Sequence, residues 1–309
     1  MKILIVAHDA GGAEIVSAWV KANPLNQYYF ILEGPAVAVF SRKILNIDNY
    51  CVDELVEVFS KIEFVLTGTS WGSDLERNVI KASRKQNIFV ASYLDHWVNY
   101  LERFLCDGEV CLPNEIWVGD SDAENLAKNI FKETPVRMEP NQYYVEVKNE
   151  YKKIVAPSRS KKYNLLYICE PVEAASVWKT GNKNSRNYTE FSALEYFFNK
   201  LNLLKLSENL EKIKLRLHPS EHKSKYDRVM ETAQKKCLCE MDVSENTSLL
   251  EDYAWADYVV GISSMALVIA AMLEKKVFTC VPENVKVTKL PLQNIFPLNK
   301  DTIFLRYRS

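Results

Sequence analysis

The stretch WADYVVGISSMALVIAAMLEKKVF, residues 255–278, contains a short apolar strand, a polar loop, a long apolar helix and the start of another strand. The helical part, MALVIAAMLEKK, is apolar on nearly every side, which predicts that it is buried. A strand, a helix and a second strand in succession form a βαβ unit, the repeating element of a parallel sheet. The stretch therefore predicts an α/β fold.

The same alternation extends from this stretch in both directions. In the first half we expect strands at 2–7, 27–34, 64–70, 88–95 and 115–120, and helices at 12–23, 36–44, 74–87 and 121–131. In the second half we expect strands at 163–170, 211–219 and 277–283, a strand and loop at 257–264, and helices at 189–204, 225–236, 248–256 and 265–276. The polar, lysine-rich segment 136–162 is interpreted as the inter-domain connection. The sequence thus predicts two Rossmann-like domains, 1–150 and 151–309, with parallel sheets facing a cleft.

Composition and charge exclude several classes of protein. The chain has 309 residues, 48% of them hydrophobic, which suits one large or two medium-sized domains. Its formal net charge of -1 gives no positive field for nucleic acid, so any anion site must be local. The longest apolar run, 265–273, is about half of the roughly 18 residues that a membrane span needs. We expect a cytoplasmic protein, and the lysines of 152–162 leave peripheral contact with the inner face of the membrane open.

Polar residues gather where three predicted strands of the first half end, which is where open parallel sheets bind ligands. In AHDAGGAE (7–14) the glycines permit a tight turn, and His8 and Asp9 could handle a proton. GTSWGSDLE (68–76) offers small hydroxyls for a sugar or a phosphate. YLDHWVNYLERF (93–104) offers a carboxylate base, aromatic faces for a sugar ring and an arginine for an acidic group. A helix cap is the structural alternative for these loops.

The loop RLHPSE (216–221) follows an alternating strand of the second half. Arg216 lies on the face opposite the leucines, and His218 can donate a hydrogen bond to a phosphate or a leaving oxygen. Pro219 fixes the turn, and Glu221 can bind ribose hydroxyls or cap the next helix. A surface loop without function is the alternative.

The loop GISS (261–264) separates an apolar strand from an apolar helix in the same half. Gly261, Ser263 and Ser264, together with the free amides at the start of the helix, could form an uncharged phosphate cradle. A capping serine pair is the alternative. Two such loops after strands of one half are more specific than either loop alone.

Two further patterns suggest metal chemistry but are interpreted otherwise. Asp120 and Asp122 form a DxD pair, which in other folds holds a metal–nucleotide complex; because they open a predicted helix, we interpret them as cap residues. The seven cysteines are odd in number and lack zinc-ligand spacing, which predicts reduced thiols. We expect neither a required metal nor a cofactor.

RLHP resembles the histidine–proline motif of bacterial sialyltransferases, polysialyltransferases and capsule Kdo transferases, and residues 255–278 resemble their serine-pair motif. These families are GT-B glycosyltransferases that use cytidine nucleotides, and a similar pair of motifs occurs in teichoic-acid glycerophosphotransferases, which use CDP-glycerol. The resemblance is at motif level and covers about residues 160–290. It implies a GT-B fold whose second half is the nucleotide-donor domain and whose first half is the acceptor domain. It also implies that His218 assists departure of the nucleotide phosphate, which Ser263 and Ser264 hold.

These observations predict a metal-independent glycosyltransferase that moves an acidic sugar (sialic, pseudaminic or legionaminic acid, or Kdo) from CMP to a surface glycan or glycolipid. Asp95 is the first choice of base, with Asp9 or His96 next. The predicted donor residues are Arg216, Pro219, Glu221, Gly261, Ser263 and Ser264, and the predicted acceptor or cleft residues are His8, Gly11, Gly12, Thr69, Ser70, Trp97 and Arg103. The alternatives are a CDP-polyol phosphotransferase, a UDP-sugar transferase or 2-epimerase of the same fold, and a non-catalytic nucleotide-sugar-binding subunit.

Overall fold

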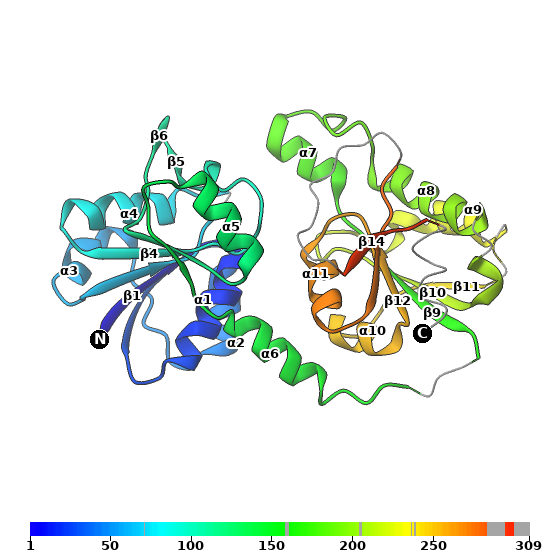
Figure 1. Cartoon of the computed structure of the whole chain (residues 1–309), viewed down its shortest axis with the longest axis horizontal. Helices are drawn as coiled ribbons and strands as arrows, with labels where there is room; N and C mark the ends of the chain where they lie inside the picture. Colours follow the sequence, from blue (N-terminus) through cyan, green and yellow to red (C-terminus); the bar gives the residue numbers. More distant parts are fainter. Residues whose placement is uncertain are drawn as a thin grey trace. The chain divides into compact units, whose positions relative to one another are not determined.

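The computed structural model describes residues 1–70, 72–157, 161–203, 206–235, 237, 239–282 and 294–299. The chain divides into two compact units, Met1–Val147 and Lys148–Ser309, and each contains a six-stranded sheet surrounded by helices (Figure 1). The sequence-based expectation of an α/β fold with two Rossmann-like domains is confirmed. Trp71 of the loop 68–76 and residues 158–160 of the lysine-rich segment lie outside the described residues.

The sheet of the first unit has the strand order β2-β1-β3-β4-β7-β8. Its strands are β1 (Lys2–Ala7), β2 (Gln27–Leu32), β3 (Phe64–Thr67), β4 (Phe89–Tyr93), β7 (Glu115–Val118) and β8 (Val136–Met138). The helices of this unit are α1 (Ala10–Ala22), α2 (Pro35–Lys43), α3 (Leu55–Phe59), α4 (Leu75–Lys85) and α5 (Ser121–Ile130), and α6 (Gln142–Tyr151) crosses the boundary to the second unit. The unit also has a hairpin, β5 (Leu105–Cys106) with β6 (Glu109–Val110), and 3-10 turns at Val52–Glu54 and Glu102–Phe104.

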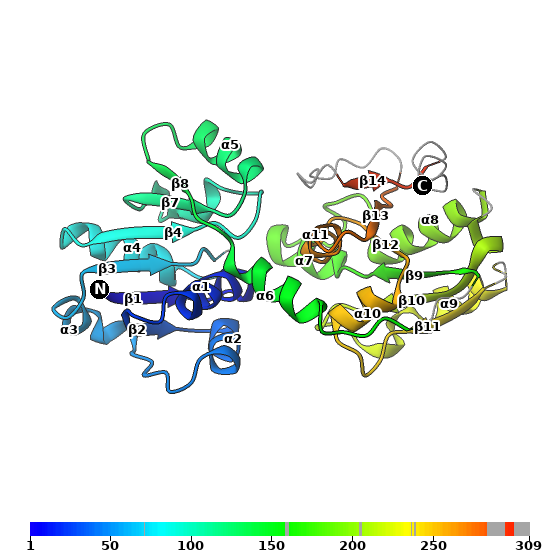
Figure 2. The same cartoon turned by 60° about the horizontal axis from the view of Figure 1, so that its bottom comes forward.

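Burial explains why β1 lies inside this sheet. Residues 3–7 are fully buried, and β1 pairs in parallel with β2 on one side and with β3 on the other. The connections β1 to β2 and β3 to β4 run in opposite directions, so right-handed crossovers place α1 and α4 on opposite faces (Figure 2). Beside β2 the pairing is reduced to one bridge, Phe30 with Asn49, and the Asn49 side chain exchanges hydrogen bonds with the Leu32 backbone.

The sheet of the second unit has the strand order β11-β10-β9-β12-β13-β14, and its strand pairs are parallel. Its strands are β9 (Tyr163–Ile168), β10 (Leu210–Arg216), β11 (Glu240–Val243), β12 (Tyr258–Gly261), β13 (Lys276–Thr279) and β14 (Ile295–Pro297). Its helices are α7 (Val172–Thr180), α8 (Glu190–Leu203), α9 (Asp227–Gln234), α10 (Leu249–Trp255) and α11 (Met265–Met272), with 3-10 turns at Leu206–Asn209 and Lys223–Tyr226. Helix α11 buries Leu267, Val268 and Ile269, as its all-round apolar sequence predicts.

Several short elements differ from the sequence-based expectation. The segment 136–162, expected to be a plain connection, contains the edge strand β8 and helix α6. Helix α7 occupies part of the loop expected after β9, and β11 and β14 form the two edges of the second sheet. The three residues of β8 and of β14 are too few to show an alternation, and β11 (Glu240–Val243) contains two acidic residues, which are rare in strands. Within the described residues, no helix is both long and apolar enough to cross a bilayer.

Candidate functional site

Polar loops follow the carboxyl ends of the central strands in both units. In the first unit they follow β1, β3 and β4, and in the second they follow β9, β10 and β12. The direction of winding reverses between β1 and β3, and again between β9 and β12. Such switch points are where open parallel sheets bind ligands, and the candidate residues fall on or next to these loops.

Asp95 and Arg103 form a buried ion pair beyond β4. Arg103 Nη1 lies 2.6 Å from Asp95 Oδ1 and 2.9 Å from Thr69 Oγ1, and the two charged side chains are only 9% and 14% exposed. The arginine that was expected to meet an acidic ligand therefore binds an acidic side chain of its own unit. In the described part of the chain the hydrogen bonds to Asp95 go to Oδ1, and Oδ2 faces Gly11 at the start of α1.

Thr69 and Ser70 were expected to contact the acceptor but are each only 2% exposed. Thr69 Oγ1 accepts from Arg103, and Ser70 Oγ donates to the Ser73 carbonyl at 2.7 Å. Their hydroxyls hold the loop after β3 and support Arg103. We therefore revise their role from ligand contacts to supports.

Close packing explains the two glycines at the start of α1. A Cβ at Gly11 would overlap Asp95 Oδ2, and a Cβ at Gly12 would lie 3.2 Å from Gly68 Cα. Any larger side chain at either position would push α1 away from the loops after β3 and β4. The glycines thus bring the first turn of α1 against the carboxylate that is the predicted base.

The side chains of His8 and Asp9 interact with each other at the start of α1. His8 Nδ1 lies 2.8 Å from Asp9 Oδ1, and Asp9 makes no side-chain hydrogen bond to the helix that it precedes. Asp9 is thus the N-cap residue of α1 by its backbone, without a capping hydrogen bond to its side chain. Both side chains are partly exposed, at 23% and 32%.

Glu76 is a buried carboxyl next to this loop that sequence reasoning missed. It is 3% exposed, Oε1 accepts the His8 N–H at 2.9 Å, and Oε2 has no partner within the described residues. Burial raises the pKa of Glu76, and hydrogen bonds from its own backbone and from the His8 backbone oppose that shift. The residue stands in the loop 68–76, where it was read as part of a polar helix start.

His96 is oriented by the backbone that follows it. Its Nδ1 accepts the Trp97 N–H at 2.9 Å, so in the neutral ring the proton is on Nε2. Burial lowers the pKa of His96, although Asp95 opposes that shift. The ring is therefore suited to donate a hydrogen bond at neutral pH, which ranks it below Asp95 as a base.

Trp97 and Asp120 form a structural pair. The Trp97 ring is 7% exposed and its N–H lies 3.1 Å from both Asp120 oxygens, so the ring is not the free stacking surface expected from the sequence. Asp120 Oδ1 also accepts the Ala123 N–H at 2.7 Å, which confirms that it caps α5. A recess of about 10 Å³ beside them has room for about one water molecule. It is lined by Leu94, Asp95, His96, Trp97, Gly119, Asp120, Ala123, Asn141 and Tyr144.

His218 stands on an exposed loop directly beyond β10. Its Nδ1 lies 2.7 Å from Ser220 Oγ and accepts the Ser220 N–H at 3.3 Å, so Nε2 carries the proton of the neutral ring. Partial burial lowers the pKa of His218, with Glu221 opposing the shift. His222 has the same arrangement with Ser224, but it precedes the 3-10 turn Lys223–Tyr226 rather than ending a strand.

Glu221 uses both of its oxygens inside the second unit. Oε2 accepts the His218 N–H at 3.0 Å, while Oε1 accepts from Lys225 Nζ at 2.8 Å and from Tyr226 OH at 2.7 Å. The side chain is 2% exposed, and Lys225 is also paired with the buried Glu190. Glu221 therefore shapes the His218 loop, and we withdraw its expected contact with ribose.

Arg216 is likewise held within its own unit. Its Nη1 lies 2.9 Å from a carboxylate oxygen of Asp252, which is 0% exposed, and 2.5 Å from the Thr247 carbonyl. Asp252 also accepts hydrogen bonds from the hydroxyls of Ser244 and Thr247. Arg216 thus neutralises a buried carboxylate, which leaves it poorly placed to bind a donor phosphate.

The predicted phosphate cradle already contains a carboxylate. Glu170 Oε1 accepts the Ser263 N–H at 2.6 Å, and Ser263 Oγ lies 3.3 Å from Oε2. Ser264 Oγ is buried and has no partner within the described residues. Glu170 was missed because we expected it to be the last residue of a strand, whereas β9 ends at Ile168. At Gly261 the packing is close, since a Cβ would lie 3.1 Å from the Ile168 carbonyl oxygen.

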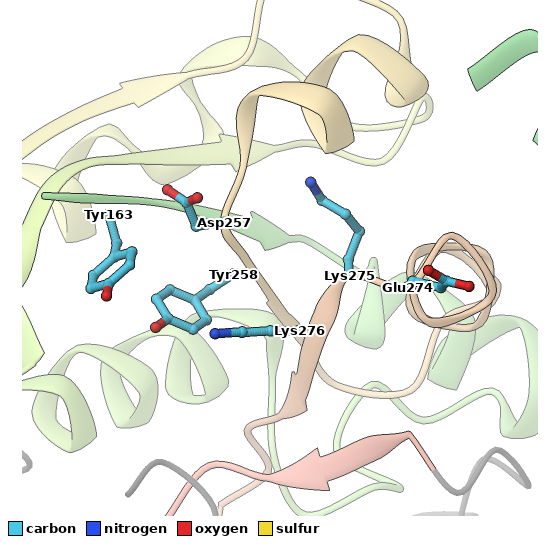
Figure 3. Close-up of a pocket in the computed structure, with 6 residues that line it drawn as sticks. All are labelled: Tyr163, Asp257, Tyr258, Glu274, Lys275 and Lys276. Atoms are coloured by element: carbon cyan, nitrogen blue, oxygen red, sulfur yellow. The ribbon is translucent and has the colours of Figure 1, made fainter. Parts of the chain in front are cut away.

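A pocket of about 150 Å³ in the second unit lies away from these loops (Figure 3). It is lined by Tyr163, Asp257, Tyr258, Glu274, Lys275 and Lys276. Tyr163, Tyr258 and Lys276 are the first residues of β9, β12 and β13, so the pocket is at the amino ends of these strands. Its two lysines face an equal number of carboxylates, which gives it no net attraction for a phosphate. In the described residues, no group of three or more His, Cys, Asp and Glu is arranged to hold a metal ion.

Comparison with known proteins gives the fold but no family. No family model matches the sequence, and no curated protein is significantly similar to it. Among solved structures, UDP-GlcNAc 2-epimerase from Methanocaldococcus jannaschii is 12% identical with a TM-score of 0.61, over 100% of this chain and 92% of that one. UDP-GlcNAc 2-epimerase from Neisseria meningitidis, bound to UDP-GlcNAc, is 12% identical with a TM-score of 0.55, over 90% and 82%. MurG from Acinetobacter baumannii is 11% identical with a TM-score of 0.50, over 93% and 80%. The chain has the two-domain, Rossmann-like fold of these proteins, which is the GT-B fold.

Proposed function

We propose that the chain is a nucleotide-sugar enzyme of the GT-B fold that transfers a sugar from a cytidine nucleotide to a hydroxyl acceptor. The placement of His218 carries this proposal. It follows the carboxyl end of β10, next to the switch point of the second sheet, and Ser220 fixes its proton on Nε2. A neutral imidazole that presents an N–H can hydrogen-bond a phosphate oxygen as negative charge develops on it.

The choice of donor is supported by the motif resemblance. Histidine–proline and serine-pair motifs together are typical of enzymes that use CMP-sugars, and an acidic sugar linked to CMP is the donor that this resemblance favours. The serine pair here surrounds a carboxylate, so Ser264, with its unpartnered hydroxyl, is a better candidate for the phosphate than Ser263.

The first unit is the proposed acceptor domain, and Asp95 remains the proposed base. Its Oδ1 is fixed by Arg103, and Oδ2 is the oxygen proposed to take the proton of an incoming hydroxyl. His96, with its proton on Nε2, would orient that hydroxyl by hydrogen bonding. Asp9 is the second choice of base because its side chain is 32% exposed and lies 2.8 Å from the His8 ring.

A 2-epimerase is the second candidate function. The M. jannaschii and N. meningitidis structures that share the fold are UDP-GlcNAc 2-epimerases, and the first of them spans the whole of this chain. An epimerase would convert UDP-GlcNAc without an acceptor, whereas a transferase needs one. The two candidates therefore differ in nucleotide and in acceptor requirement.

The test begins with thermal-shift titrations of CMP, CDP, UMP, UDP and GDP against the wild-type chain, His218→Ala and His222→Ala. His222 is the matched control because its hydrogen bonds to Ser224 repeat those of His218 to Ser220. We expect CMP and CDP to raise the melting temperature selectively. Losing one hydrogen bond to a charged phosphate should weaken binding about tenfold in His218→Ala and leave His222→Ala unchanged.

Turnover separates the remaining readings. CMP release from CMP-sialic acid or CMP-Kdo in the presence of a glycan acceptor is the expected result, and CMP release from CDP-glycerol would indicate a phosphotransferase. Conversion of UDP-GlcNAc alone, followed by proton NMR, would make the chain an epimerase. Nucleotide binding without any turnover would indicate a non-catalytic subunit. Equal loss of binding in the two histidine variants would remove the observation that carries the proposal.

A further inference from the structure

Glu170 lies where the proposed donor phosphate would bind. Ile168 and Gly261 are paired in neighbouring strands, so the residues two positions further on, Glu170 and Ser263, come to lie side by side. The carboxylate accepts the backbone N–H of Ser263 at 2.6 Å, and the backbone groups of Ile262 and Ser264 next to it help to lower its pKa. These amides belong to the loop that leads into α11, whose N-cap is Ser264, and a phosphate in the predicted cradle would lie against the same groups.

The direct hydrogen-bond partners of Glu170 in the described residues carry no positive charge, and a nearby cation, Arg186, acts on Tyr188. Within the described residues, no lysine, arginine or histidine is among its partners. The titratable groups that face it are Tyr167 on β9, Cys169 beside it and Tyr188 before α8. Burial raises the pKa of each of these three groups, so they are uncharged at neutral pH.

The electrostatics of Glu170 make it a group that can gain a proton. Burial raises the pKa of its carboxyl, while the amides and the Ser263 hydroxyl partly oppose that shift. A second anion brought within a few ångströms would favour the protonated form further, because two like charges cannot share one poorly solvated site at low cost. Ser264 Oγ is an independent sign of an incomplete site, since it is buried beside the cradle with no partner in the described chain.

We propose that Glu170 makes donor binding depend on a proton: a nucleotide phosphate enters the Ser263–Ser264 cradle only together with a protonated Glu170. This inference rests on the proposed function of that cradle. The proton comes from the solvent and joins one carboxylate oxygen, and no other bond is made or broken. The protonated carboxyl then donates to a phosphate oxygen, while Ser264 Oγ supplies a further hydrogen bond. Glu170 thus sets both the affinity for phosphate and its dependence on pH.

Calorimetric titration measures this directly. Wild-type chain, Glu170→Gln and Glu251→Gln are titrated with CDP and with inorganic pyrophosphate between pH 7 and pH 9, in two buffers of different ionisation enthalpy. Glu251 is the matched control because it also accepts a backbone N–H at a helix start, from Ser248 at 2.6 Å, but on the exposed N-terminus of α10. The wild-type and Glu251→Gln chains should take up about one proton per CDP, and their affinity should fall up to tenfold per pH unit once Glu170 ionises. Glu170→Gln should take up none and bind CDP about tenfold more tightly at pH 8.

The outcomes separate this inference from the proposed function. Equal CDP affinity and no proton uptake in wild type and Glu170→Gln would overturn the role of Glu170 and leave nucleotide binding intact. Tighter pyrophosphate binding by Glu170→Gln without preference for cytidine nucleotides would support the inference and contradict the proposed donor. Failure of all chains to bind either probe at millimolar concentration would overturn both. If Glu170→Gln does not fold, the proton count of the wild-type chain alone decides.

Discussion

Asp95 and Glu170 occupy the same kind of position in the two units but have opposite electrostatic surroundings. Each stands two residues beyond the end of a central parallel strand, Asp95 after β4 and Glu170 after β9. Asp95 faces the fixed positive charge of Arg103 at 2.6 Å, whereas Glu170 is held by backbone amides and a hydroxyl. A carboxylate at a strand end can therefore be a permanently paired group in one unit and a titrating group in the other.

The difference follows from what each loop supplies. The loop after β4 continues into the 3-10 turn Glu102–Phe104, which returns Arg103 to the carboxylate. The register of β9 with β12 instead places Glu170 beside the amide of Ser263 in the loop before α11. An arginine gives a charge that does not vary with pH in the physiological range, while amide dipoles stabilise a carboxylate without neutralising it. We infer that the loop after β4 keeps a constant charge on Asp95, whereas the loop after β9 allows the charge on Glu170 to vary.

Asp95→Asn tests the loop after β4, and of the variants considered it has the largest expected effect. The amide keeps an oxygen that accepts from Arg103, but it cannot take a proton from an acceptor hydroxyl. We expect the rate of glycosyl transfer to fall by about 10²- to 10⁴-fold, the usual contribution of a general base. Affinity for CDP should not change, because the proposed donor site is in the other unit. Asp9→Asn is the control, and a larger loss of rate in Asp9→Asn than in Asp95→Asn would move the base to Asp9.

Arg103→Met tests whether the Asp95–Arg103 ion pair stabilises the first unit as much as its burial indicates. Removing the cation leaves the Asp95 carboxylate, which is only 14% exposed, without a counter-ion. This should lower the free energy of unfolding of the first unit by about 3–5 kcal/mol. Urea unfolding followed by circular dichroism measures the loss. Adding Asp95→Asn to Arg103→Met removes the stranded charge and should restore part of the stability.

Arg216→Met in the second unit is the matched comparison for that variant. It also leaves a buried carboxylate, Asp252, without its cation. The hydroxyls of Ser244 and Thr247 still donate to Asp252 at 2.5 and 2.8 Å, whereas Asp95 keeps only the Thr69 hydroxyl at 3.4 Å. The loss of stability should therefore be smaller than for Arg103→Met. Equal losses would mean that hydroxyl groups do not compensate for a missing cation in this protein.

The fold could be predicted from the sequence because its signals are local and repeated. The buried strand at 2–7, the apolar helix at 265–272 and their polar turns each follow a simple hydrophobic pattern. The edge strand β8 could not be predicted, since three residues carry no period and its pairing with β7 is decided by tertiary packing.

The candidate site could be predicted only as far as residue types at strand ends. The positions of Asp95 and His218 were found in this way, and the capping role of Asp120 was predicted and confirmed. The partners of these side chains could not be predicted, because they are distant in the sequence. Glu170 and Ser263 are 93 residues apart, and Arg216 and Asp252 are 36 apart. The parallel between YLD (93–95) and YICE (167–170), two acidic strand ends, was the available signal for Glu170.

Comparing Ser263→Ala with Ser264→Ala tests the cradle around Glu170, and these two variants have the smallest expected effects. Ser263 donates to Glu170, so its removal should cost about 1 kcal/mol of stability, while the unpartnered Ser264 hydroxyl should cost less than about 0.5 kcal/mol. If Ser264 Oγ is reserved for a phosphate, its loss should nevertheless weaken CDP binding about fivefold to tenfold by calorimetry. A residue that contributes little to folding but measurably to binding serves the ligand, because a buried hydroxyl without a partner would otherwise be a net cost. Ser264→Ala with unchanged CDP affinity would instead show that the phosphate does not reach this side of the cradle.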